Sequence, residues 1–144
     1  MKYAIKTEIV INASKERVYN ALTDFKNYHT WNPFIIESKG DAIEGTTLVN
    51  KLKQGEQTFT FKPILTCVVP NEKFEWLGSL LFKGLFDGNH YFHIEELENG
   101  QVLLTHGENF SGILTSFLLK RIGDSTRNGF VEMNIALKSL LESR

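Results

Sequence analysis

The sequence has little of what defines several common protein classes. Its one cysteine, Cys67, excludes an internal disulfide, and no Cys/His spacing typical of a zinc site is present. No apolar run approaches the roughly 18 residues of a membrane span, and the N-terminal residues, with Lys6 and Glu8 among them, lack the apolar stretch of a signal peptide. The 16 basic and 17 acidic residues nearly cancel, so no broad basic field attracts nucleic acid or anionic lipid.

These absences favour a cytoplasmic protein without stable membrane insertion, without a nucleic-acid partner, and without a metal or other cofactor. The sequence leaves the oligomeric state open. At 144 residues, the chain fits a single domain over residues 1–144, which buries roughly two-thirds of the surface that the unfolded chain exposes. In contrast to its single cysteine, the chain has 11 Phe, 4 Tyr and 2 Trp, which are more bulky apolar side chains than a minimal core requires.

The first third of the chain predicts one strand followed by two short helices. Residues 3–11 alternate between apolar and charged side chains, as in a half-buried strand. Ser14 is a suitable N-cap for a helix, and Asp24 for a second, brief helix through Tyr28. Pro33 should end that helix, because the residue before a proline disfavours the helical conformation.

The middle of the chain has a period of two, with glycine, asparagine and proline between the segments. It predicts six further strands near residues 34–40, 46–53, 57–69, 72–80, 86–97 and 101–110. In the segment 57–69, one face is expected to be apolar and to carry Phe59, Phe61, Leu65, Cys67 and Val69. Pro63 interrupts this segment and predicts an edge strand or a bulge, because proline has no backbone N–H for the ladder.

After Gly112 the period returns to that of a helix, with an apolar stripe toward residue 142 formed by Leu114, Leu118, Ile122, Phe130, Met133, Leu137 and Leu140. A helix of about 28 residues spans on the order of 42 Å. It is the one predicted element long enough to cover the apolar face of the sheet. We therefore expect an α+β helix-grip fold, in which a curved seven-stranded antiparallel sheet wraps around a long C-terminal helix, with two short helices after the first strand.

Five segments resemble a known superfamily: residues 9–18 (IVINASKERV), 22–25 (LTDF), 28–34 (YHTWNPF), 84–88 (GLFDG) and 106–112 (HGENFSG). Together with the order of elements, they resemble the SRPBCC superfamily, also called START-like or helix-grip, and within it the bacterial polyketide cyclase/dehydrase-like branch. The resemblance covers essentially the whole chain. It implies a ligand cavity between the sheet and the last helix. The iron ligands of the Rieske oxygenases and the glycine-rich loop of the plant allergens, two other branches, have no counterpart here.

The hairpin around Gly100 carries the most informative chemistry. A three-residue loop with Gly100 in the left-handed conformation pairs His90 with Glu108 and Phe92 with His106, all on one face. The sequence therefore predicts that His90, His106 and Glu108 form a polar patch on an otherwise apolar surface. A carboxyl group beside an imidazole in a poorly hydrated space can exchange protons near neutral pH.

Four interpretations of this patch remain open at this point. The three side chains form a satisfied hydrogen-bonded group in the core, recognise a ligand, perform acid–base catalysis, or, least favoured, hold a metal ion. Bulky aromatic side chains belong to the core or line a ligand cavity. The predicted ligand-binding residues are Trp31, Phe34, Phe59, Phe61, Phe74, Trp76, Phe86, His90, Phe92, His106, Glu108, Phe117 and Phe130, with Trp31 and Phe34 expected at the cavity mouth.

We therefore predict a carrier or sensor that binds a small hydrophobic or amphipathic ligand in an internal cavity. One alternative is a polyketide cyclase/dehydratase-like enzyme that uses His90, His106 and Glu108 as its acid–base groups. A second alternative is a protein-interaction module. An apolar patch on the outer face of the sheet would support it, whereas Thr58, Lys62 and Glu75 predict a solvated face.

Overall fold

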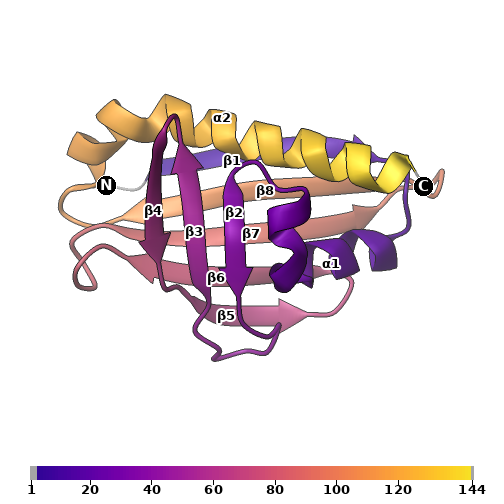
Figure 1. Cartoon of the computed structure of the whole chain (residues 1–144), viewed down its shortest axis with the longest axis horizontal. Helices are drawn as coiled ribbons and strands as arrows, with labels where there is room; N and C mark the ends of the chain where they lie inside the picture. The colour runs from indigo at the N-terminus through magenta and orange to yellow at the C-terminus, as the bar shows by residue number, and fades with distance from the viewer. Residues whose placement is uncertain (1–2, 144) are drawn as a thin grey trace.

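The computed structural model describes residues 3–143 and contains two antiparallel sheets and one long helix (Figure 1). The elements are β1 (Tyr3–Ile11), α1 (Lys15–Thr23), the short 3-10 helix η1 (Phe25–Thr30), β2 (Ile35–Lys39), β3 (Val49–Gln54), β4 (Gln57–Phe61), β5 (Ile64–Val69), β6 (Lys73–Ser79), β7 (Asp87–Glu96), β8 (Val102–Ser111) and α2 (Thr115–Glu142). The large sheet has the strand order β1-β8-β7-β6-β5, and the small sheet has the order β2-β3-β4. The predicted α+β helix-grip fold is confirmed.

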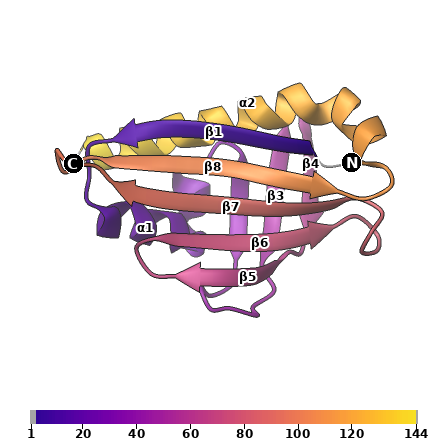
Figure 2. The ribbon, with the colours of Figure 1, turned by 180° about the vertical axis from the view of Figure 1, so that it is seen from behind.

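The two sheets and α2 enclose the core. In Figure 1 the strands of the small sheet cross in front of the large sheet, and α2 runs along one side of both. Figure 2, from the opposite side, shows that no helix covers the outer face of the large sheet. Helix α2 contacts β1 and β8 of the large sheet and β3 of the small one, so the space between the sheets is closed on that side by the helix.

The beginning of the chain folds as its local sequence predicts, except that Asp24, at the N-cap of η1, makes no side-chain capping hydrogen bond. The side chain of Ser14 accepts a hydrogen bond from the backbone N–H of Arg17 at 3.2 Å and so caps α1. The 3-10 helix ends at Thr30, before Pro33. Helix α1 packs against β7 of the large sheet, and η1 packs against β2 of the small one.

One predicted strand is two strands, which raises the strand count from seven to eight. The segment 57–69 divides at Pro63 into β4 and β5, which lie in different sheets and are each an edge strand. The reason is that proline cannot donate to a ladder. A register shift between Leu65 and Cys67 in β5 also breaks the alternation of its side chains between the two faces of the sheet. The common apolar face predicted for this segment is therefore wrong.

The hairpin of β7 and β8 has the predicted register. His90 pairs with Glu108, and Phe92 pairs with His106. Gly100 has φ of 83°, in the left-handed region that glycine adopts without strain, and this permits the short turn. The predicted polar residues therefore share one face of the hairpin.

Helix α2 has 28 residues, as the sequence predicts, but it is buried unevenly. None of residues 116–125, all of which the structure describes, is buried, whereas Thr126, Phe130, Met133, Asn134, Leu137 and Leu141 are. The second half of α2 therefore belongs to the core, and the first half lies over a more open end of the molecule. Over residues 3–143, no helix is long and apolar enough to cross a membrane.

Candidate functional site

Two buried histidines lie in contact at the centre of the core. His90 comes from β7 and His106 from β8, and their Nε2 atoms are 2.7 Å apart. Aromatic rings enclose them: Trp76 stacks on His90 with ring centroids 4.8 Å apart, and Phe130 stacks on His106 at 4.4 Å. Both imidazoles are therefore shielded from water.

A hydrogen-bonded chain continues from His106 toward α2 and β1. His106 Nδ1 lies 2.8 Å from Oδ1 of Asn134, whose amide nitrogen donates to Oγ1 of Thr7 at 2.8 Å. The Thr7 hydroxyl donates to the backbone carbonyl of His106 at 2.7 Å. Three elements that are distant in the sequence are thus joined by one polar chain.

Glu108 lies beyond His90, past the last hydrogen bond of this chain. Its Oε1 is 3.4 Å from Nδ1 of His90, and 18% of its side chain is exposed. Its Oε2 lies over Gly88, where a Cβ atom would overlap it. Gly88 therefore makes the room that the Glu108 carboxyl group occupies, and this group connects the buried histidines with solvent.

Burial shifts the protonation of all three groups toward the uncharged forms. Desolvation lowers the pKa of His90 to about 3 and raises the pKa of Glu108 to about 8. The pKa of His106 also lies well below its usual value of 6.5, chiefly through desolvation and then through the neighbouring His90. Burial at this site therefore favours neutral imidazoles and a protonated carboxyl group.

The small sheet contributes polar and aromatic groups that face this site. Gly78 pairs with Gly88 across β6 and β7, and a Cβ atom at Gly78 would lie 3.6 Å from the Phe61 ring of β4. Asn50 pairs with Phe61 and is fully buried, and its Oδ1 accepts from Ser38 while its Nδ2 has no partner. Phe61 and Asn50 therefore lie on the inner face of the small sheet, opposite the Glu108 end of the chain.

The structure brings most of the predicted site residues together. The buried members around the two histidines are Phe34, Phe74, Trp76, Phe92 and Phe130. Trp76, Phe92 and Phe130 contact the imidazoles directly. Phe34 packs on Phe130 at 5.6 Å and Phe74 on Phe92 at 4.8 Å between ring centroids. Phe86 is half-buried and stacks on Phe110. These aromatic side chains fill the centre of the site.

Three predicted residues lie elsewhere. Phe59 belongs to the edge strand β4 and is 49% exposed, and Phe117 is 56% exposed with the Arg121 guanidinium over its ring. Trp31 packs against Tyr28 and lines a surface hollow between the short helices and the end of α2. The prediction that Phe34 lies with Trp31 at a cavity mouth is wrong for Phe34, which is only 3% exposed and packs in the core.

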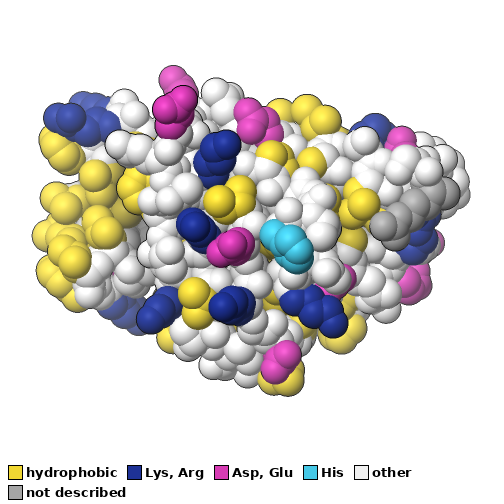
Figure 3. All heavy atoms as spheres, viewed as in Figure 1, with side chains coloured by type: hydrophobic (Ala, Val, Ile, Leu, Met, Phe, Trp, Pro, Cys, Tyr) yellow, Lys and Arg dark blue, Asp and Glu magenta, His cyan; other side chains and the backbone are white. Residues whose placement is uncertain are grey.

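Exposed apolar side chains gather at the open end of the molecule. Leu80, Leu81 and Phe82 of the β6–β7 loop and Ile113 and Phe117 at the start of α2 are all exposed. Figure 3 shows a group of hydrophobic side chains at this end, where the first turns of α2 lie. We call these five residues the apolar end. Strand β8, which carries Glu108, runs into the loop that carries Ile113, with the buried Phe110 between the two residues.

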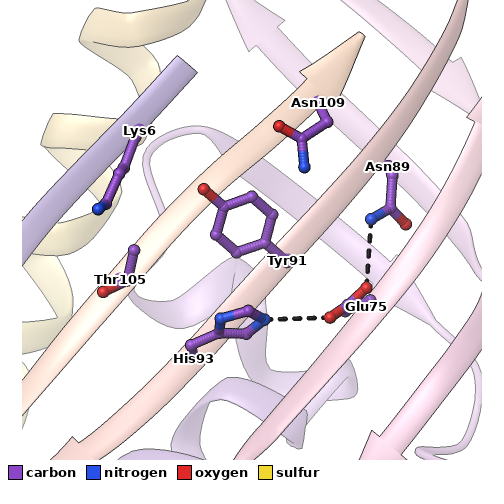
Figure 4. A pocket seen from close by; sticks show the side chains of 7 residues that line it. All are labelled: Lys6, Glu75, Asn89, Tyr91, His93, Thr105 and Asn109. Atoms are coloured by element: carbon purple, nitrogen blue, oxygen red, sulfur yellow. Dashed lines mark hydrogen bonds and ion pairs between the residues drawn. The ribbon is translucent and has the colours of Figure 1, made fainter. Parts of the chain in front are cut away.

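The outer face of the large sheet has a different character. A hollow of about 380 Å³ on this face is lined by Lys6, Glu75, Asn89, Tyr91, His93, Thr105 and Asn109 (Figure 4). Glu75 accepts from Asn89 at 3.2 Å and contacts Nε2 of His93 at 3.0 Å. The prediction of a solvated outer face therefore fits the polar side chains found there.

Sequence reasoning missed three polar residues of the site: Thr7, Asn134 and Asn50. Asn134 lies between Met133 and Leu137 on the buried face of α2, and Asn50 is a fully buried asparagine on β3. A polar residue within an apolar stripe is the signal that would have found Asn134. Within residues 3–143, no group of three or more His, Cys, Asp or Glu side chains is arranged to hold a metal ion.

Comparison with solved structures defines the class of this fold. The chain is similar to a START superfamily protein from Mycobacterium smegmatis, with 17% identity, a TM-score of 0.74 and 97% coverage of both chains. It is similar to the Zhui aromatase/cyclase from Streptomyces sp. R1128, with 12% identity, a TM-score of 0.81, and coverage of 100% of this chain and 96% of that one. It is also similar to norcoclaurine synthase from Thalictrum flavum, with 14% identity, a TM-score of 0.75, and coverage of 99% and 96%. At these identities the likeness shows the fold alone, that of START-like helix-grip proteins.

The family follows from the sequence match. The model of the family described as polyketide cyclase/dehydrase and lipid transport matches residues 3–126. This chain belongs to that family. No match to the chain was found among curated proteins. Family and fold together fit a ligand-binding protein of the START and polyketide cyclase type.

Proposed function

We propose that this protein is a carrier or sensor that binds a small, largely apolar ligand between its two sheets and α2, with Glu108 at the polar end of the site. The observation that carries the proposal is the position of Glu108. Its carboxyl group lies 3.4 Å from Nδ1 of His90, which contacts His106 and stacks on Trp76, and 18% of the Glu108 side chain is still exposed. A few convergent polar groups in an apolar surrounding are typical of ligand sites.

The apolar end supports this proposal as a route of entry. The first half of α2 contains no buried residue from 116 to 125, and the neighbouring loop exposes Leu80, Leu81 and Phe82. Phe110 lies between this end and Glu108 on the same face of β8, so a ligand entering here meets the stacked rings of Phe86 and Phe110 before the Glu108 carboxyl. Because Phe34 and Phe130 contact each other at the centre, a ligand that goes deeper displaces aromatic side chains.

Native mass spectrometry of the protein purified from its own cells tests the proposal, with the denatured mass as reference. We expect a discrete mass adduct that disappears on denaturation and can be extracted as an apolar molecule. The absence of an adduct, together with no uptake of an apolar fluorescent probe, would mean that the aromatic side chains are simply core.

A second candidate function is acid–base catalysis of the cyclase/dehydratase kind. The raised pKa of Glu108, about 8, favours it, because a general acid works best with a pKa near the working pH. Replacing Glu108 by glutamine separates the two functions. A binding protein keeps most of its affinity in the variant, whereas an enzyme keeps binding and loses turnover.

A protein-interaction module is the third candidate. An apolar patch on the outer face of the large sheet would support this function, but that face carries Lys6, Glu75 and Asn109 instead. This polar lining does not favour the interaction module.

A further inference from the structure

The direction of every hydrogen bond in the polar chain follows from one backbone carbonyl. The carbonyl oxygen of His106 can only accept, so the single hydroxyl proton of Thr7 is donated to it. The Thr7 oxygen must then accept from its other neighbour, the side chain of Asn134. Its amide nitrogen therefore faces Thr7, and its Oδ1 faces His106.

This orientation fixes the tautomers of both histidines. Because Oδ1 of Asn134 only accepts, Nδ1 of His106 carries a proton, and in a neutral ring Nε2 then has a lone pair. His90 donates its Nε2–H to that lone pair over 2.7 Å. In the neutral ring of His90, Nδ1 is left with a lone pair that faces Glu108.

The chain therefore ends on an acceptor that lies 3.4 Å from Oε1 of Glu108. An ionised carboxylate here would place its negative charge against the lone pair of His90, whereas a protonated carboxyl group directs its proton toward Nδ1. We propose that Glu108 is held as a neutral acid with its proton on Oε1, and that its Oε2 accepts the hydroxyl group of an uncharged, otherwise apolar ligand. The ligand half of this inference rests on the proposed function.

The surroundings of Glu108 favour a hydroxyl group over a charged group. Among residues 3–143, the side chains of Glu108, His90 and His106 make their hydrogen-bond, ion-pair and ring contacts with each other, with Asn134 and with aromatic rings, and none of these contacts is with a lysine or arginine. A ligand carboxylate would therefore enter without a counter-charge. Within residues 3–143, only the amide nitrogens of Asn32 and Asn50 are both fully buried and without a hydrogen-bond partner. The oxygens of Glu108 are not among these atoms, and 18% of its side chain is exposed, so its carboxyl group is within reach of solvent and ligand.

Nitrogen NMR of the imidazole rings at neutral pH tests the neutral acid directly. We expect His106 protonated at Nδ1 only and His90 protonated at Nε2 only, together with a carbon shift of the Glu108 carboxyl typical of the protonated form. Thr7→Val removes the hydroxyl that orients Asn134 and is expected to mix the two His106 tautomers, whereas Thr7→Ser keeps the single tautomer. A carboxylate shift for Glu108, or the opposite tautomers in the unmodified protein, would overturn the proposal.

Three matched probes test the ligand: naphthalene, 1-naphthol and 1-naphthoate. We expect 1-naphthol to bind roughly 3- to 10-fold more tightly than naphthalene, as one net hydrogen bond allows, and 1-naphthoate to bind most weakly. Glu108→Gln should keep this preference, because its amide nitrogen can donate to His90 Nδ1 while its oxygen accepts from the ligand. Glu108→Leu should abolish the preference for 1-naphthol.

The two proposals fail in different ways. If none of the three probes binds, the binding function fails and takes the ligand half of this inference with it, while the NMR experiment still decides the state of Glu108. If naphthalene and 1-naphthol bind equally, or if 1-naphthoate binds best, the binding function stands and the inference about the hydroxyl group is wrong.

Discussion

His90 and Glu108 lie directly opposite each other on β7 and β8, with Nδ1 of the imidazole 3.4 Å from Oε1 of the carboxyl group. The same cause shifts the pKa values of the two residues in opposite directions, because desolvation lowers the pKa of the imidazole and raises that of the carboxyl group. The pair is therefore uncharged near neutral pH, unlike an ordinary ion pair. This relationship leads to measurable consequences for stability.

The stability of the protein should fall between pH 6.5 and 8 because of Glu108. Its pKa rises from 4.5 to about 8 on folding, so in this range the folded chain holds a proton that the unfolded chain has lost. The free energy of unfolding then decreases by about 1.4 kcal/mol per pH unit. Below pH 6.5 the lowered pKa values of His90 and His106 make the free energy of unfolding rise with pH, which opposes the effect of Glu108. The wild-type protein and the Glu108→Gln variant should therefore be compared above pH 6.5. Urea denaturation at several pH values measures the effect, and Glu108→Gln should remove this part of the slope. The same slope in both proteins would contradict the assignment.

Replacing Asn134 by leucine should destabilise the fold by about 1–3 kcal/mol, since it leaves the buried Nδ1–H of His106 without an acceptor. Asn128→Leu is the matched control, because Asn128 is an exposed residue on the same helix. That control should change the free energy of unfolding by no more than about 0.5 kcal/mol. Equal effects of the two substitutions in urea denaturation would mean that the Asn134 contact contributes nothing specific.

Replacing Gly88 by alanine should destabilise the protein by about 1–3 kcal/mol, because the new Cβ atom overlaps the Glu108 carboxyl group. Combining it with Glu108→Ala should recover much of this loss, which a double-mutant cycle measures. Gly123→Ala is the contrasting variant: it lies in α2 with nothing near its Cβ position and should stabilise by about 0.5–1 kcal/mol. Additive costs for Gly88→Ala and Glu108→Ala would show that the two sites do not interact.

Replacing Leu81 by asparagine should stabilise the protein by about 0.5–1 kcal/mol. Leu81 has φ of 60°, a left-handed conformation that asparagine tolerates better than leucine. Its side chain is 86% exposed, so little apolar burial is lost. Leu80→Asn, at a neighbouring position that is 46% exposed and has no positive φ, should give no gain. A thermal unfolding series compares the three proteins, and a loss of stability in Leu81→Asn would refute the argument.

Much of the fold was predictable because its signals are local. The cap at Ser14 and the period of α2 each depend on residues close together in the chain, and both were predicted correctly. The register of His90 with Glu108 was also predictable, because the turn at Gly100 fixes which residues face each other. The identity of these candidate residues therefore came from the sequence.

Other features depended on contacts between distant segments. Pro63 indicated an interruption, but that β4 and β5 join different sheets depends on how the two sheets cross. Phe59 and Phe117 have the apolar side chains of cavity residues and are exposed because of where β4 and the first half of α2 lie. No local pattern distinguishes them from Phe61 or Phe130.

The sequence by itself determined the order of elements apart from the division of residues 57–69 into β4 and β5, the pairing of β7 with β8, and the presence of two histidines and a glutamate on one face. Only the tertiary structure decided that Thr7 and Asn134 complete a chain with His106, because β1 and α2 meet β8 there from opposite ends of the sequence. The physical reason is the range of the interactions. Backbone conformation and turn geometry are set by neighbours along the chain, whereas the direction of a buried hydrogen bond is set by whichever groups packing places beside it.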